Sequence, residues 1–313
     1  MSDYLWDKSG QPDPEIEALE RLLSPLGAKP EARFVFPGRR TWISIAIAAS
    51  VLAVLGGAWL VLNRNHSAWQ VSALAGAPQV ARLERGESLT TDAGSRAKLE
   101  IASVGEVEVE PNSQLSVMTL GKTEQRLNLK RGKISAMIWA PPGQFFVNTP
   151  SAVTVDLGCA YTLEVDGGGT SLVKVTAGWV AFENDGKESF IPATAACVTR
   201  VGRGPGIPYY EDATAALQNA VSRFDQSGEQ ASVTQILSEA RPRDAITLWH
   251  LLRRVPADNR GPVFDRLAQL INVPASINRP GIVNGDAGMI DALWNSLDLG
   301  DTSWWRMWKT RMR

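Results

Sequence analysis

The feature that most constrains this chain is the stretch from Thr41 to Leu62, which is 22 residues long and has no charged side chain. As a helix it would be about 33 Å long at ~1.5 Å per residue. That length is enough for one crossing of a hydrocarbon core about 30 Å thick. The sequence therefore predicts a transmembrane helix at residues 41–62. A cleaved signal peptide and a buried helix of a soluble protein are the two alternatives.

The charges beside this stretch predict its orientation. Arg39 and Arg40 stand directly before it, whereas the first positive charge after it is Arg64. Basic residues collect on the cytoplasmic side of membrane helices. We therefore expect a single-pass protein whose N-terminus is cytoplasmic and whose C-terminal body lies on the far side of the membrane.

Residues 1–40 form a short head in which a helix is expected to begin at Pro14. Residues 1–23 carry six acidic and two basic side chains, so an anionic lipid surface would repel this helix. Its apolar face is therefore predicted to contact a protein partner, and a disordered stub with a weak helix is the alternative. Spaced one helical turn apart, the residues of that face are Ile16, Leu19, Leu23 and Leu26.

Between residues 69 and 201 the pattern changes to short alternating segments. Glu106-Val107-Glu108-Val109-Glu110 alternates polar and apolar residues, which is typical of a strand with one wet face. Turn signals recur about every 8 to 12 residues, a spacing that indicates an all-β roll or sandwich. We expect roughly a dozen strands of antiparallel character, with uncertain boundaries.

Several motifs in this region follow one another in a characteristic order. They are Gly86-Glu87-Ser88-Leu89 with Thr91 and Gly94, Leu127-Asn128-Leu129 with Gly132, Phe146-Val147-Asn148-Thr149-Pro150, and Val175 with Gly178-Trp179-Val180. Over residues 80–200 the chain thereby resembles the FecR family of single-pass envelope regulators. In one departure, Gly158-Cys159-Ala160-Tyr161 carries a cysteine where the family has a threonine.

The resemblance implies a β-rich periplasmic sensor domain in a protein of the bacterial inner membrane. In characterised members this domain receives a signal from an outer-membrane transporter and passes it to a cytoplasmic sigma factor held by the head. We therefore expect a cytoplasmic regulator, with a sigma factor as one candidate, at the head. An envelope or outer-membrane protein is the partner expected at the body.

Residues 207–313 return to helical spacing, as in the apolar run from Ile246 to Leu252. Short connections between such segments predict an all-α domain of helical hairpins. The last stretch carries Trp304, Trp305 and Trp308 among basic residues. These tryptophans either dock onto the domain's own core or form an interface with a membrane or a partner.

The sequence offers little that suggests catalysis. It contains no phosphate-binding loop, no nucleophile elbow and no zinc-protease motif, and it has only two histidines. The net charge of −1 gives no general surface for nucleic acid. Cys159 and Cys197 either pair as a disulfide or stay buried as free thiols. We predict no enzyme, no catalytic residue, no cofactor, no metal site and no direct contact with nucleic acid.

The predicted chain has several domains. They are a cytoplasmic head (1–40), a transmembrane helix (41–62), a FecR-like β domain (69–201) and an α-helical C-terminal domain (207–313). The predicted function is that of a non-enzymatic, membrane-anchored sensor or regulator that passes an envelope signal to a cytoplasmic partner, as an anti-sigma factor does. The alternative is an envelope scaffold, or a module that binds polysaccharide or protein without signalling.

Overall fold

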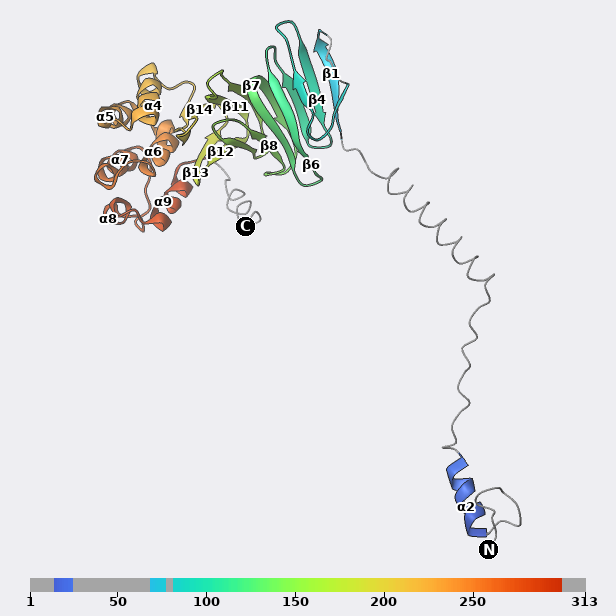
Figure 1. The fold of residues 1–313 in the computed structure, drawn as a ribbon. Coiled ribbons are helices and arrows are strands. Elements are labelled where there is room, and N and C mark those ends of the chain that lie inside the picture. Colours follow the sequence, from blue (N-terminus) through green and yellow to red (C-terminus); the bar gives the residue numbers. More distant parts are fainter. Residues whose placement is uncertain (1–13, 25–67, 77–80, 300–313) are drawn as a thin grey trace. The chain divides into compact units, whose positions relative to one another are not determined.

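The computed structural model describes residues 14–24, 68–76 and 81–299 (Figure 1). The chain divides into two compact units, Met1–Asn65 and His66–Arg313. In the first unit the described residues form the helix α2 (Pro14–Leu23). The other described elements belong to the second unit, in which the strands come first and the helices follow.

The strands of the second unit form one mixed sheet with 16 strands among the described residues. They are β1 (Trp69–Ala75), β2 (Arg82–Leu83), β3 (Ser88–Thr90), β4 (Arg96–Ile101), β5 (Gly105–Val109), β6 (Gln114–Leu120), β7 (Gln125–Ile138), β8 (Phe145–Asn148), β9 (Val153–Asp156), β10 (Ala160–Val165), β11 (Ser171–Ala177), β12 (Trp179–Asn184), β13 (Lys187–Pro192), β14 (Ala195–Arg200), β15 (Gly204–Pro205) and β16 (Tyr209–Tyr210). The longest path through them runs β13-β12-β9-β8-β7-β10-β11-β14-β15.

The long strand β7 organises this sheet. Its first half pairs antiparallel with β6 and parallel with β8, and its second half pairs antiparallel with β5 and β10. The two halves meet near Gly132, whose φ is +94°. A Cβ at this position would overlap Ser113, and positive φ strains any other residue. The fold therefore explains why a glycine stands at the end of the motif Leu127-Asn128-Leu129 with Gly132.

The alternation expected at Glu106–Val109 is present in β5. Val107 and Val109 are buried in the core, whereas Glu106 and Glu108 are partly exposed. Glu106 forms an ion pair of 2.5 Å with Lys98 on the neighbouring strand β4. One face of this strand is thus packed and the other is wet, as the period of two predicts.

The helical region of the second unit follows β16. It comprises α4 (Ala215–Ser227), α5 (Gln230–Glu239), the 3₁₀ turn η2 (Pro242–Asp244), α6 (Ala245–Leu252), α7 (Ala257–Leu270), α8 (Arg279–Val283), α9 (Ala287–Leu293) and the 3₁₀ turn η3 (Trp294–Ser296). Figure 1 shows these helices gathered beside the part of the sheet that contains β13 and β14. Buried side chains of the strands and the helices belong to one hydrophobic core.

The first correction to the predicted fold class concerns its membrane helix, which has no counterpart among the described residues. No helix in the described ranges is both long and apolar enough to cross a membrane. The longest of the helices described is α7, with 14 residues and hence a length of about 21 Å. The residues of the predicted span, 41–62, lie outside the described ranges.

The fold class is also wrong in separating an antiparallel β domain from an all-α domain. Residues His66–Arg313 form one compact unit, and Trp179 of β12 meets Trp294 of η3 with ring centroids 5.8 Å apart. The sheet is mixed because the chain leaves the far end of β7 and returns to pair β8 with its first half. Strand length and turn spacing describe local structure, so they carry no signal for this long-range packing.

Candidate functional site

The contact face predicted for the head lies on α2. Leu19 and Leu23 are 62% and 48% exposed, as expected for side chains without a core to cover them. The side chain of Ile16 and the whole of Leu26 lie outside what the structure describes. Leu22, which the prediction left out, is 76% exposed and stands three residues after Leu19 on the same side of the helix. We name Leu19, Leu22 and Leu23 the head face.

Local charges favour the helical state of α2. Glu15 and Glu17 lie in its first turn and Arg21 in its last turn, where each sign complements the helix dipole. Glu17 and Arg21 also form an exposed i,i+4 ion pair of 3.9 Å. Such a pair contributes only about 0.3–0.5 kcal/mol, so these charges favour the helix without making it stable alone.

The hydroxyl groups of Thr91, from the first FecR-like motif, and of Ser113 bond the backbone of neighbouring strands. Thr91 is buried; its Oγ1 donates to the carbonyl of Glu110 at 2.7 Å and accepts from the Ser113 N–H at 3.0 Å. Ser113 Oγ in turn accepts from the Lys133 N–H at 2.9 Å, next to the bend of β7. Each hydroxyl satisfies backbone groups that burial would otherwise leave unpaired. The motif therefore serves folding at these positions.

The cysteine that departs from the family pattern belongs to a buried polar cluster. Cys159 Sγ donates to Asp156 Oδ2 at 2.6 Å, and the Gly158 N–H donates to Asp156 Oδ1 at 2.7 Å. Burial raises the pKa of Asp156 to about 7, although these hydrogen bonds act to lower it. Burial, with the nearby carboxylate, raises the pKa of the Cys159 thiol far above its usual value. The thiol is thus a hydrogen-bond donor and a poor nucleophile.

The second cysteine is bonded elsewhere. Cys197 Sγ donates to the carbonyl of Gly206 at 3.2 Å, and burial raises the pKa of this thiol to about 12. Both cysteines are buried and free in the structure. Of the two states that the sequence left open, disulfide or buried thiols, the structure has the thiols. Each has its own partner, Asp156 for Cys159 and Gly206 for Cys197.

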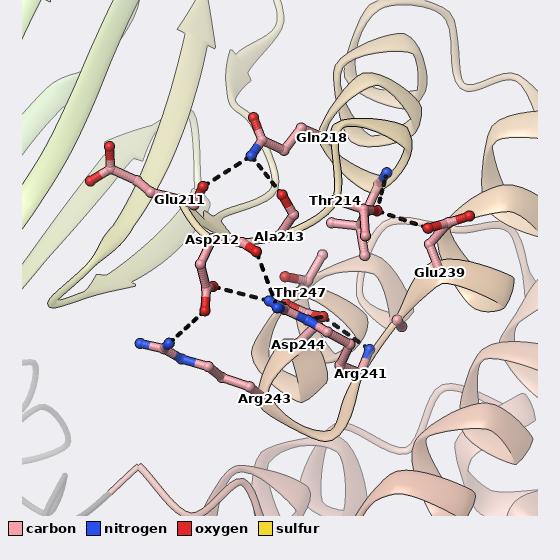
Figure 2. A network of polar contacts seen from close by, with 12 residues as sticks. Glu211, Asp212, Ala213, Thr214, Gln218, Glu239, Arg241, Arg243, Asp244 and Thr247 are labelled. Atoms are coloured by element: carbon pink, nitrogen blue, oxygen red, sulfur yellow. Dashed lines mark hydrogen bonds and ion pairs between the residues drawn. The ribbon is translucent and has the colours of Figure 1, made fainter.

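A network of charged groups joins the last strand to the helices (Figure 2). Asp212 accepts from Arg241 Nη2 at 3.0 Å and from Arg243 Nη1 at 2.9 Å. Arg241 also donates through Nε to Asp244 Oδ2 at 2.8 Å, and the side chain of Asp244 is fully buried. The hydrogen bond from Arg241 lowers the pKa of Asp212 below its usual value, and the charges of both arginines act in the same direction. We name these four residues the junction network.

Beside this network, α4 begins with a complete N-cap. Thr214 Oγ1 accepts from the Leu217 N–H at 3.1 Å and donates to Glu239 of α5 at 2.8 Å. Gln218 Nε2 donates to the carbonyls of Glu211 and Ala213. These bonds satisfy backbone groups at the point where the strands end and the helices begin.

Buried His250 links α6 to the sheet through a hydrogen bond. Its Nε2 accepts from the Phe190 N–H of β13 at 3.0 Å, and its Nδ1 lies 2.8 Å from the carbonyl of Ile246. Since a backbone N–H can only donate, Nε2 carries no proton and Nδ1 donates to Ile246. Burial lowers the pKa of His250 well below its usual value. The imidazole is therefore a neutral structural group.

The predicted tryptophan interface, Trp304, Trp305 and Trp308, lies outside the described residues. The tryptophans that the structure does describe in the helical region are buried. Trp249 and Trp294 meet edge to face with ring centroids 4.8 Å apart, a favourable geometry for aromatic pairs.

The polar groups described above serve the fold. In the described parts of the chain no group of three or more His, Cys, Asp or Glu side chains could hold a metal ion. The buried thiols and the imidazole are engaged in hydrogen bonds within the fold. The head face had a clear signal in the sequence, whereas the junction network had none, because Asp212 and Arg241 are far apart in the chain.

Comparison with known proteins bears on the β region. Residues 87–181 match the model of a family described as FecR protein, so the chain carries a FecR domain, as its motifs predicted. This match covers less than a third of the chain. None of the curated proteins matches this chain.

Two solved structures are also similar. They are crystal structures, at 1.65 and 2.50 Å resolution, of a protein from Parabacteroides distasonis described as a putative anti-sigma factor. Both are 14% identical to this chain, with TM-scores of 0.35 and 0.36. Each match covers 43% of this chain. The chain spans 63% of the length of the protein in those structures.

Proposed function

We propose that this chain, which carries a FecR domain, is a signalling regulator whose head binds a cytoplasmic regulatory protein. The FecR domain at residues 87–181 is the single observation that carries the signalling role. A sigma factor is the class of partner that we expect at the head, and an envelope or outer-membrane protein is the partner that we expect at the body. We expect the protein to act through contacts and without catalysis.

The exposure of the head face supports it as the site of this contact. A ten-residue helix is too short to be stable in water without burial of one face, yet Leu19 and Leu22 are more than half exposed. Leucines at i, i+3 and i+4 are the anchors of a helix that lies in an apolar groove. A groove on the partner would therefore bury Leu19, Leu22 and Leu23 together and stabilise the helix.

The bonds between strands and helices support the proposal that the body receives a signal as one structural unit. The junction network and His250 bond the end of the strand region to the helices, through Asp212 after β16 and through Phe190 of β13. A partner on either region would thereby act on both. The location predicted from the sequence, the bacterial inner membrane with a periplasmic body, stays a prediction, because it depends on residues outside the described ranges.

The experiment is a purification of the tagged full-length chain from its native cells, with the bound proteins identified by mass spectrometry. The test variant is Leu19→Asp/Leu23→Asp, which places two charges in the head face. The control variant is Arg21→Asp, which changes the charge of α2 by the same amount on the opposite side of the helix. We expect a sigma factor or another cytoplasmic regulator with the wild type and the control, and its loss in the test variant.

The alternative role gives a different pattern. A scaffold that sends no signal would retain the same envelope proteins in all three preparations and would retain no cytoplasmic regulator. That result would overturn the proposed function. Recovery of a regulator in equal amounts from all three would retain signalling and would overturn the head face as its binding site.

A further inference from the structure

One pocket at the boundary between strands and helices is unusually basic. Its volume is about 380 Å³, and its lining comes from the start of β13, the β14–β15 turn, the end of α4 and the end of α6. The basic side chains that line it are Lys187, Arg200, Arg203, Arg253 and Arg254. One acidic residue, Asp225, is also in the lining. Five positive charges against one negative charge leave this pocket with a net charge of +4 when Asp225 is ionised.

The single carboxylate is directed into the protein. Asp225 Oδ2 accepts from the Ile207 N–H at 2.9 Å, and its Oδ1 lies 3.8 Å from Arg254 Nη1. This close approach requires Gly206, because a Cβ there would overlap the carboxylate of Asp225. Asp225 is thus bonded to the backbone, and its charge offsets part of the charge of Arg254 and Arg200.

The cations are poorly matched by partners. Arg203 makes no side-chain hydrogen bond or ion pair with another described residue, and Arg200 donates only to the neutral Ser222 Oγ at 3.2 Å. Arg254 Nη2 donates to Ser189 Oγ at 2.5 Å and to the carbonyl of Glu188 at 3.3 Å, but its Nη1 is buried without a hydrogen-bond partner among the residues described. Buried donors that stay unpaired are costly, and donors of charged groups more so. A bound anion would satisfy them.

The remaining two cations, Arg253 and Lys187, each have a partner of their own. The guanidinium of Arg253 stacks over the ring of Trp249 at 4.7 Å and is also attracted by Asp291. Lys187 Nζ donates to the carbonyl of Arg203 at 3.5 Å, which is a long and weak bond. Both therefore add positive potential, while Arg200, Arg203 and Arg254 have donors left for an anion.

We propose that this pocket binds the phosphate group of a phosphate ester. Arginine forks recognise phosphate by paired, charge-assisted hydrogen bonds. Cations that converge from a turn and a helix end suit a tetrahedral group with several acceptor oxygens better than a planar carboxylate. The volume leaves space beyond the phosphate for the esterified group, against Phe224 and Pro205. This site is separate from the head face, so the proposal does not depend on the identity of the head's partner.

The test is calorimetric titration of the full-length chain with inorganic phosphate, with chloride at equal ionic strength as the reference. The variants are Arg203→Gln, whose side chain has no described partner to lose, and the double variant Arg200→Gln/Arg203→Gln. Arg131→Gln is the matched control, because it removes an exposed arginine of β7 that lies outside the pocket. We expect saturable binding to the wild type and the control, a Kd about tenfold higher for Arg203→Gln, and a larger loss in the double variant.

Two further probes distinguish the source of the phosphate. Glycerol 3-phosphate that competes with inorganic phosphate would identify a soluble ester. Binding to phosphatidylcholine vesicles that contain phosphatidic acid, lost in the double variant, would identify a lipid headgroup. The proposal would be overturned by an absence of saturable phosphate binding, by an equal Kd in the wild type and the double variant, or by failure of both ester probes. Thermal unfolding of each variant without ligand shows whether it is folded.

Discussion

The helices α2 and α6 are both short, and their surroundings differ completely. Every side chain of α2 that the structure describes is exposed, whereas all eight residues of α6 are buried. The helix α2 carries three glutamates and one arginine besides its leucines, and α6 has no acidic residue, lysine or arginine. Isolated helices of this length are unstable in water. The contrast teaches that α6 is a helix because the core surrounds it, while the apolar side of α2 is available for another protein.

The strongest way to break this comparison is to remove the largest side chain of α6. Trp249 is fully buried, and its Nε1 donates to the carbonyl of Ile290 at 2.8 Å. Trp249→Ala should lower the free energy of unfolding by about 3–5 kcal/mol, because it leaves a cavity and an unpaired carbonyl. Urea unfolding followed by circular dichroism measures this change.

The matched control is the same substitution at an exposed position. Trp139 is 59% exposed and donates through Nε1 to the carbonyl of Ser103 at 2.9 Å. Trp139→Ala should lower the free energy of unfolding by no more than about 1 kcal/mol. Equal losses for the two variants would contradict the role of burial in α6.

A second prediction concerns the protonation of His250 in α6. The pKa of His250 is lowered by burial from its model-peptide value of 6.5, so below that pH the unfolded chain binds a proton that the folded chain does not. The contribution of His250 to stability is therefore complete above about pH 6.5 and falls as the pH falls. Between pH 6.5 and pH 5 this contribution should fall by up to about 1.6 kcal/mol.

His250→Phe tests this, because phenylalanine keeps the shape of the ring and cannot titrate. The variant should lose about 1–3 kcal/mol at pH 8, where the Phe190 N–H lacks its acceptor. Its stability should then fall less steeply than that of the wild type between pH 6.5 and pH 5. Other titrating groups are common to both proteins, so identical slopes would show that His250 is not the source.

The contrast also shows which parts of the molecule the sequence could predict. The helix of the head, the alternation in β5 and the FecR motifs are local patterns, and the structure or the family match contains each of them. The parallel pairing of β7 with β8 and the packing of helices on the sheet depend on contacts between distant segments. The basic pocket is a further case, since the fold alone brings Arg203 and Arg254 into the lining of one pocket. No motif marks either residue.

A third prediction compares the ion pairs of the two helices. Arg241 bonds Asp244, which is the N-cap residue of α6 and has a fully buried side chain, whereas Arg21 of α2 bonds Glu17 in solvent. Arg241→Lys should lower the free energy of unfolding by about 1 kcal/mol, because lysine cannot bond Asp212 and Asp244 at once with a planar fork. Arg21→Lys should change it by less than about 0.5 kcal/mol. Chemical denaturation of both variants measures the two effects, and a larger effect at Arg21 would reverse the interpretation.

The substitution with the smallest expected effect on folding lies in the head face. It tests the contrast between α2 and α6 most directly. Leu22 is 76% exposed, so Leu22→Ala removes little buried surface and should change the free energy of unfolding by no more than about 0.5 kcal/mol. If the face is instead buried by a partner, the same substitution should weaken binding of the regulator recovered with the head by about tenfold, the cost of one lost apolar anchor. Thermal unfolding and a binding titration on the same preparation separate the two. A clear loss of stability without loss of binding would mean that the leucine serves the fold, and α2 would then resemble α6 after all.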